Sequence, residues 1–148
     1  MENCPYCERF EKGDFTHVLM ADAYAITVVE SNPFRKGQCI VIPRRHMTSL
    51  SEMTEEENAS VFKMITATSK ALEKTLSARK TYLLSIADSV RHLHYHLIPK
   101  LKGQVSMGQY AFISLLEAEG GYKPVEGELD AFLDTLVQNI NEPNVDMD

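Results

Sequence analysis

The segment at residues 92–98 reads HLHYHLI, so three histidines alternate with larger apolar side chains. Successive side chains of a β-strand point to opposite faces, so His92, His94 and His96 would share one face at intervals of about 6.6 Å. On a helix the same three residues would point in different directions. Three imidazoles in a row suit a site that handles a metal ion or a phosphate better than they suit a dry core. The spacing therefore predicts a strand with a chemical site on one face, and the alternative is a solvated histidine-rich strand.

Two cysteines separated by two residues, Cys4 and Cys7, form a second group with chemical potential. His46 ends one predicted strand and His92 begins another, which we expect to be its neighbour in the sheet. Two thiolates and two imidazoles are a common ligand set for structural zinc, in which four ligands close a tetrahedron. The sequence thus predicts a structural zinc at these four residues; the alternatives are two unconnected thiols or a redox pair. A thioredoxin-like pair expects a strand before its first cysteine, and position 4 leaves no room for one.

The composition is that of a soluble globular protein with one domain. The chain has 148 residues, of which 44% are hydrophobic and 24% charged, so a sizeable core can be buried. Its 15 basic and 21 acidic residues give a formal charge of -6, which argues against nucleic acid and anionic membranes as partners. The sequence contains neither a signal peptide pattern nor a run of about 20 apolar residues, so we expect a cytoplasmic protein with no membrane partner.

Hydrophobic patterning predicts an α+β fold in which helices pack on one side of a sheet. We expect strands near residues 15–19, 24–29, 38–43, 81–86 and 92–98. A capping box at Thr54 and Glu57 predicts a helix that runs to about Ala78. The last predicted element is a C-terminal amphipathic helix, because apolar residues recur at helical spacing from Leu129 to Ile140. A further helix is possible near 109–117.

Two segments carry a resemblance to a known family. The triad and the residues before it, SVRHLHYHLIP, resemble the signature of the histidine triad (HIT) family of nucleotide hydrolases and transferases. The segment at 32–46, NPFRKGQCIVIPRRH, is similar to the family's other marked segment, a strand that follows a glycine and ends in proline, basic residues and histidine. The resemblance implies an antiparallel sheet with helices packed on it. It also implies one HIT-like domain over residues 1–148, with a core at about 4–100 and a C-terminal extension at about 101–142.

The resemblance also implies roles for individual residues. His94 would be the nucleophile that attacks the α-phosphorus of a nucleotide and forms a covalent nucleotidyl-histidine. A neutral imidazole can do this near pH 7 when a hydrogen bond holds one ring nitrogen and leaves the other free. His96 would bind the phosphate oxygens, Ser89 would add a hydroxyl near the α-phosphate or leaving group, and Asn32 would lie near the ribose. Asn32 is equally suited to begin the turn at the following proline.

By the same resemblance, the substrate is a dinucleoside polyphosphate or a nucleoside phosphoramidate, a structural zinc is present, and the protein is a homodimer. Two positions depart from the family pattern: Asp88 replaces a usual glutamine, and Gln38 replaces a histidine that many members carry. A carboxylate facing a phosphate would repel it. The alternative function is therefore a nucleotide-binding regulatory protein with little turnover, and a third reading is a redox or metal-handling protein.

Overall fold

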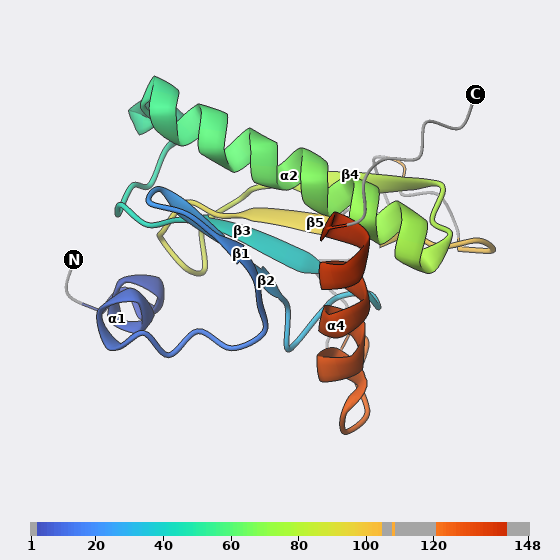
Figure 1. Ribbon diagram of the computed structural model, residues 1–148. Helices are drawn as coiled ribbons and strands as arrows, with labels where there is room; N and C mark the ends of the chain where they lie inside the picture. The colour runs from blue at the N-terminus through green and yellow to red at the C-terminus, as the bar shows by residue number, and fades with distance from the viewer. Residues whose placement is uncertain (1–2, 105–107, 109–120, 142–148) are drawn as a thin grey trace.

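The computed structural model describes residues 3–104, 108 and 121–141 of the chain, and within them the secondary structure surrounds one sheet (Figure 1). The strands are β1 (Val18–Ala21), β2 (Ala25–Val29), β3 (Cys39–Pro43), β4 (Lys80–Leu84) and β5 (Tyr95–Lys100). The helices are α1 (Pro5–Lys12), α2 (Glu55–Leu76) and α4 (Glu128–Asn141), with a 3-10 turn at Leu50–Glu52. All strand pairs are antiparallel, in the order β1-β2-β3-β5-β4. The expected α+β fold with an antiparallel sheet is confirmed.

Both faces of the sheet are covered, which differs from our expectation of helices on one side. Every residue of β2 and β3 is buried. On one face the sheet packs against α2 and α4. On the other face, side chains of α1 and the segment after it pack against four strand residues. These are Tyr6, Phe10 and Phe15 against Ile26, Val28, Ile40 and Ile42. Figure 1 shows α1 on the side of the sheet away from α2. The continuous apolar runs in these two strands follow from this double cover.

The helix α1 was missing from our prediction, which treated Cys4 and Cys7 as a pair of spaced cysteines outside any helix or strand. Cys4 is instead the N-cap of α1, Pro5 takes the first helical turn, and Gly13 ends the helix with a left-handed φ of 63°. Proline suits the first turn because its missing N–H would have no partner there, and glycine suits a left-handed cap. The short helix therefore carries Cys4 and Cys7 at its N-terminal end.

The two long helices were predicted correctly. The side chain of Thr54 accepts a hydrogen bond from the backbone N–H of Glu57 at the start of α2, which ends at Leu76. Helix α4 follows the predicted apolar periodicity, and Leu136, its fully buried residue, belongs to the core beneath α2. Asn139 of α4 donates a hydrogen bond to Thr75 of α2 over 2.6 Å. The predicted helix at 109–117 lies outside the described residues.

The strand that carries the triad begins later than predicted, at Tyr95. His92 and His94 lie on the approach to β5, where backbone contacts outside the sheet ladder hold the chain. The Leu93 N–H donates to the carbonyl of Met47 over 2.7 Å, and the Ser85 hydroxyl donates to the carbonyl of His94 over 2.6 Å. The alternation of faces is nevertheless as predicted: Leu93, Tyr95 and Leu97 enter the core beneath α2. The histidines lie on the opposite side of the segment.

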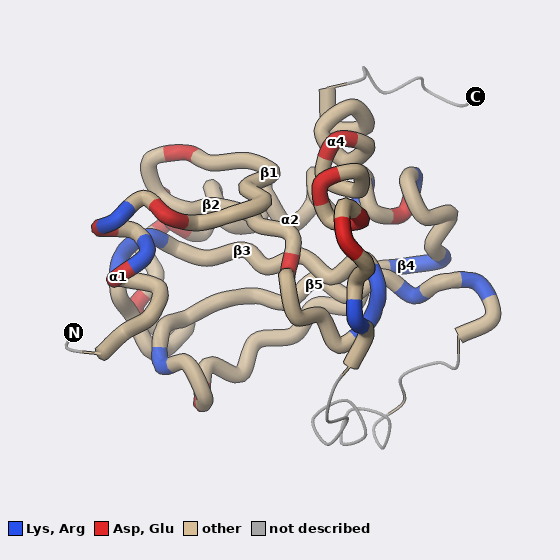
Figure 2. Tube along the Cα trace, turned by 90° about the horizontal axis from the view of Figure 1, so that it is seen from below, with Lys and Arg blue, Asp and Glu red and all other residues tan. Residues whose placement is uncertain are grey.

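Charged residues are absent from two of the three inner strands. Strands β2 and β3 carry none, whereas Figure 2 shows acidic and basic residues on α1 and acidic residues along α4. Among the described helices, none combines the length and apolar character that a membrane span requires.

Candidate functional site

Four predicted metal ligands from three distant segments meet at one point. Cys4 and Cys7 come from the start of α1, His46 follows β3, and His92 precedes β5. One potential ligand atom from each of the four lies within 4.8 Å of the others. The shortest contacts join Cys7 Sγ to His46 Nδ1 at 3.3 Å and Cys4 Sγ to His92 Nδ1 at 3.4 Å.

The donor set and its geometry fit tetrahedral zinc. Zinc bonds of about 2.3 Å to sulfur and about 2.0 Å to nitrogen place neighbouring S and N ligands about 3.5 Å apart. The Sγ–Nδ1 contacts in the cluster are 3.3–3.5 Å. His92 Nε2 lies 2.7 Å from the carbonyl of Pro43, which can only accept a hydrogen bond, so this nitrogen carries the proton. The lone pair of His92 is therefore on Nδ1, the nitrogen that faces the sulfurs, and the carbonyl acts as an outer partner that orients the ring.

His94, next on this side of the chain, has one ring nitrogen engaged by the backbone. Its Nδ1 lies 2.6 Å from the carbonyl oxygen of His92. Because a carbonyl only accepts, Nδ1 is the donor and the neutral ring keeps its lone pair on Nε2. His94 is 6% exposed, and burial lowers its pKa, which favours this neutral form. A neutral imidazole with a free Nε2 is a competent nucleophile near pH 7.

His96 lies within β5, where it pairs with Ile40 of β3 on one side and Leu84 of β4 on the other. Its ring stands 4.8 Å from that of His94, centroid to centroid, in an edge-on arrangement. Burial, with a smaller contribution from His94, lowers the pKa of His96 to about 4. His96 is therefore neutral near pH 7, so it can offer a hydrogen bond but carries no positive charge.

The two histidines open onto a cavity of about 420 Å³ on the α1 side of the sheet. Its described lining comprises Tyr6, Glu30, Phe34, Ile40, Leu84, Ile86, Ala87, Asp88, Ser89, Val90, His94 and His96. A volume of this size is ordinary for a small-molecule site. Ser89 and Asp88 come from the loop between β4 and β5, and both are exposed. The cavity lining thus contains Ser89 together with His94 and His96, and it also contains Asp88.

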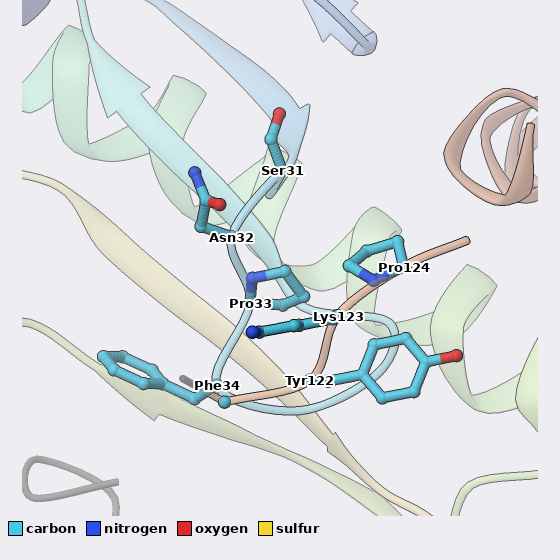
Figure 3. A pocket seen from close by; sticks show the side chains of 8 residues that line it. Ser31, Asn32, Pro33, Phe34, Tyr122, Lys123 and Pro124 are labelled. Atoms are coloured by element: carbon cyan, nitrogen blue, oxygen red, sulfur yellow. The ribbon is translucent and has the colours of Figure 1, made fainter. Parts of the chain in front are cut away.

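Asn32 lies elsewhere, in a second hollow of about 420 Å³ (Figure 3). This hollow is formed by residues 31–34 and 121–124, and Figure 3 shows the side chain of Lys123 extending between these two segments. Phe34 lines both hollows. The backbone N–H of Asn32 donates over 2.8 Å to the carboxylate of Glu30, a residue that lines the histidine cavity.

Tyr6, Glu30 and Phe34 are among the lining residues of the histidine cavity that sequence reasoning did not single out. The Tyr6 ring stands edge-on to His92 at 5.6 Å and to His94 at 5.2 Å, between centroids, so it joins the metal cluster to the cavity. Burial and the nearby Glu30 raise the pKa of Tyr6 to about 12, which keeps its hydroxyl protonated. Strand alternation was the available signal for Glu30, because it continues the face of Ile26 and Val28 one step beyond β2.

Comparison with known proteins agrees with this arrangement. Residues 12–103, more than half of the chain, match the model of the HIT domain. The chain is 26% identical over 108 residues to adenosine 5'-monophosphoramidase of Schizosaccharomyces pombe, covering 72% of this chain and 80% of the relative. It is 25% identical over 120 residues to the asymmetrical bis(5'-nucleosyl)-tetraphosphatase of the same yeast, covering 78% of this chain and 65% of that enzyme.

A solved structure shares the fold. The zinc-bound histidine triad family protein of Mycobacterium smegmatis superposes with a TM-score of 0.69 at 16% identity, over 93% of each chain. The protein described here belongs to the HIT domain family.

Proposed function

We propose that this protein is a nucleotidyl hydrolase or transferase that acts at the α-phosphate of a nucleotide substrate. The observation that carries the proposal is the hydrogen bond from His94 Nδ1 to the His92 carbonyl, which leaves Nε2 as the unprotonated nitrogen of a ring that lines a cavity. The two relatives named above act on a nucleoside phosphoramidate and a dinucleoside tetraphosphate, according to their names. A phosphoramidate or a dinucleoside polyphosphate is therefore the proposed substrate.

In the proposed reaction, Nε2 of His94 attacks the α-phosphorus. A bond forms between nitrogen and phosphorus while the bond from phosphorus to the leaving group breaks and the leaving group takes its electron pair. Water or another acceptor then attacks the same phosphorus, and the histidine departs with its ring restored. Two displacements, each through a competent leaving group, replace one difficult step.

Neighbouring groups are proposed to bind the transferring phosphoryl group and the sugar. A proton on Nε2 of His96 would donate to a phosphoryl oxygen, and the Ser89 hydroxyl would contact the α-phosphate or leaving group. Donors that are fixed before the reaction stabilise charge as it develops. The predicted ribose contact of Asn32 stays a prediction, and Glu30 is a further candidate for it, because its carboxylate lines the cavity and can accept from hydroxyls.

We also propose a structural role for zinc, held by Cys4, Cys7, His46 and His92. Four protein ligands would leave no open position for substrate, so the metal would supply cross-linking of α1 to the sheet and take no part in the reaction. The homodimer implied by the family resemblance is a further proposal. It is supported by β4, which has a described strand on one side only, and by Leu83 of that strand, which is 46% exposed.

A paired assay tests the proposed activity. Purified protein and the His94→Ala variant are given adenosine phosphoramidate and diadenosine tetraphosphate, and nucleoside monophosphate is measured as a product. We expect turnover of at least one substrate and a loss of at least about 10³-fold in His94→Ala, because removal of a nucleophile leaves only binding and electrostatic assistance. Turnover that survives in the variant would contradict the proposal.

A specific observation favours the alternative of a nucleotide-binding regulatory protein with little turnover. The described residues that line the cavity include two carboxylates, Glu30 and Asp88, and no lysine or arginine. Such a lining is unfavourable for a highly charged phosphate chain. In the paired assay, nucleotide binding at micromolar concentration without turnover of either substrate would support this alternative.

A further inference from the structure

Gln38 is a buried amide wedged between the loop before β3 and the second histidine of the cavity. It is 2% exposed. Its Oε1 lies 2.7 Å from the backbone nitrogen of Phe34, and its Nε2 lies 2.9 Å from Nδ1 of His96. Neither contact belongs to the sheet ladder, so the side chain is held at both ends by groups of the site.

These two contacts fix which group donates and which accepts in each hydrogen bond from Phe34 through Gln38 to His96. The Phe34 N–H can only donate, so the amide oxygen must face it, and the amide NH₂ must then face His96. An amide NH₂ only donates, so His96 Nδ1 accepts. A neutral imidazole has one protonated nitrogen, and for His96 that nitrogen is therefore Nε2. Turning the amide around would bring two donors together at Phe34.

We propose that Gln38 is a positioning residue that sets the tautomer of His96, so that Nε2–H is presented to the substrate's phosphoryl oxygen. The role of His96 toward the substrate rests on the proposed function, whereas the tautomer of His96 does not. The backbone fixes His94 with its lone pair on Nε2, and Gln38 fixes His96 with its proton on Nε2. Two identical side chains two residues apart thereby receive opposite roles, one as nucleophile and one as hydrogen-bond donor.

The surroundings of Gln38 hold it in register. Its backbone carbonyl accepts from the Glu30 N–H over 2.9 Å, which ties the start of β3 to the end of β2. Gly37 before it has a φ of 87°, and a Cβ there would lie 2.5 Å from Leu76 and 3.1 Å from Pro99. Glycine is thus needed for the chain to turn into β3 at this point. The burial that holds the pKa of His96 at about 4 also keeps its ring neutral, which a choice between tautomers requires.

The tautomer is measured directly by nitrogen NMR of protein labelled with ¹⁵N-histidine at pH 8, without substrate. The His96 signals are assigned by their loss in His96→Asn. We expect an unprotonated Nδ1 and a protonated Nε2 for His96 in the unaltered protein, and the reverse for His94. A protonated Nδ1 on His96, as the other tautomer or as imidazolium, would overturn the proposal whatever the variants do.

Two variants then separate a positioning role from simple packing. Gln38→Glu keeps the shape but replaces the donor by an acceptor, and a carboxylate facing Nδ1 holds the proton there. Gln38→His offers one hydrogen-bond donor and one acceptor, as glutamine does here, on a side chain of different shape. We expect a protonated His96 Nδ1 in the Glu variant and an unprotonated one in the His variant. An unprotonated Nδ1 in the Glu variant would overturn the proposal.

The effect on the reaction is measured as kcat of the same variants. With its proton moved to Nδ1, His96 has no donor for the phosphoryl oxygen, and loss of one such donor costs about 10²-fold or more in kcat. We therefore expect Gln38→Glu to lower kcat by about that factor and Gln38→His to stay within about tenfold of the unaltered protein. Equal kcat in all three proteins would overturn the role in the reaction. If His94→Ala keeps turnover while the NMR result holds, the proposed function fails and the tautomer assignment survives.

Discussion

The two cavity histidines show how an identical side chain acquires its chemistry from one neighbouring atom. For His94 that atom is the carbonyl oxygen of His92, which lies two residues earlier in the same extended segment. For His96 it is the amide of Gln38, which lies 58 residues away along the chain. The first partner follows from local backbone geometry, whereas the second needs the register between β3 and β5. Sequence spacing therefore predicted that the histidines share one face, but it could not predict the partner of His96.

The depressed pKa of His96 makes the fold sensitive to acid. Its folded value of about 4 lies below the ordinary value of 6.5, so between these pH values the unfolded chain binds a proton that the folded chain does not. Stability is then highest above pH 6.5 and falls as the pH drops toward 4, by on the order of 3 kcal/mol for this group.

Urea denaturation at pH 7.5 and pH 4.5 measures this contribution against His96→Asn. Both proteins lose metal affinity in acid, so that contribution cancels in the comparison. We expect the unaltered protein to lose on the order of 2 kcal/mol more than the variant between the two pH values. Equal losses would contradict a buried neutral His96.

Among the helices and strands, those with the strongest apolar pattern in the sequence were predicted correctly. Helices α2 and α4 were predicted because their apolar residues recur over several turns, and β3 was predicted because its apolar run is continuous. Helix α1 was not, since only Tyr6 and Phe10 mark its apolar side and its charged residues conceal the pattern. The triad strand was predicted three residues too early, because the sequence cannot indicate that hydrogen bonds to Met47 and Ser85 replace the ladder there.

Leu136 is the one described residue of helix α4 that is fully buried, while other apolar residues of the helix pack on the core with partial exposure. Leu136 is fully buried in the core beneath α2, whereas Val137, the next residue, is 36% exposed. Deletion of buried leucine atoms leaves a cavity, so we expect Leu136→Ala to lower the free energy of unfolding by about 2–5 kcal/mol. Val137→Ala is the matched control, with an expected change of less than about 1 kcal/mol. Denaturant unfolding of both variants checks this, and similar losses would refute the packing of α4.

For the whole molecule, the four-residue cluster joins helix α1, which lies outside the sheet, to two segments next to paired strands. It brings the N-terminal helix, the end of β3 and the approach to β5 to one point. The spacing of Cys4 and Cys7 predicted two members of the set, and the expected pairing of two strands predicted His46 and His92. The antiparallel pairing of β3 with β5 is the contact that brings these two histidines together. Tyr6 extends the connection, since it packs on both His92 and His94. A metal in the cluster would therefore hold one wall of the cavity in place.

Removal of the metal tests this connection. We expect protein purified without added metal to contain about one zinc per chain, and Cys7→Ser to contain much less. Free zinc at 100 times its Kd is expected to raise the free energy of unfolding of the metal-depleted protein by about 2.7 kcal/mol. The matched control is Cys39→Ala, because Cys39 is buried inside β3 away from the cluster and its loss leaves the metal content unchanged. A metal-free protein with a reversible disulfide between Cys4 and Cys7 would contradict the structural zinc and favour a redox role.

The most direct test of the central claim is to trap the reaction between its two displacements. Protein is mixed with adenosine phosphoramidate or diadenosine tetraphosphate and quenched within milliseconds without acid, which would cleave a phosphorus–nitrogen bond. Mass spectrometry of the digested protein then locates any added nucleotidyl group. We predict an adenylyl adduct on His94, absent from the His94→Ala variant. Turnover without an adduct on that peptide, or an adduct on another residue, would contradict the account.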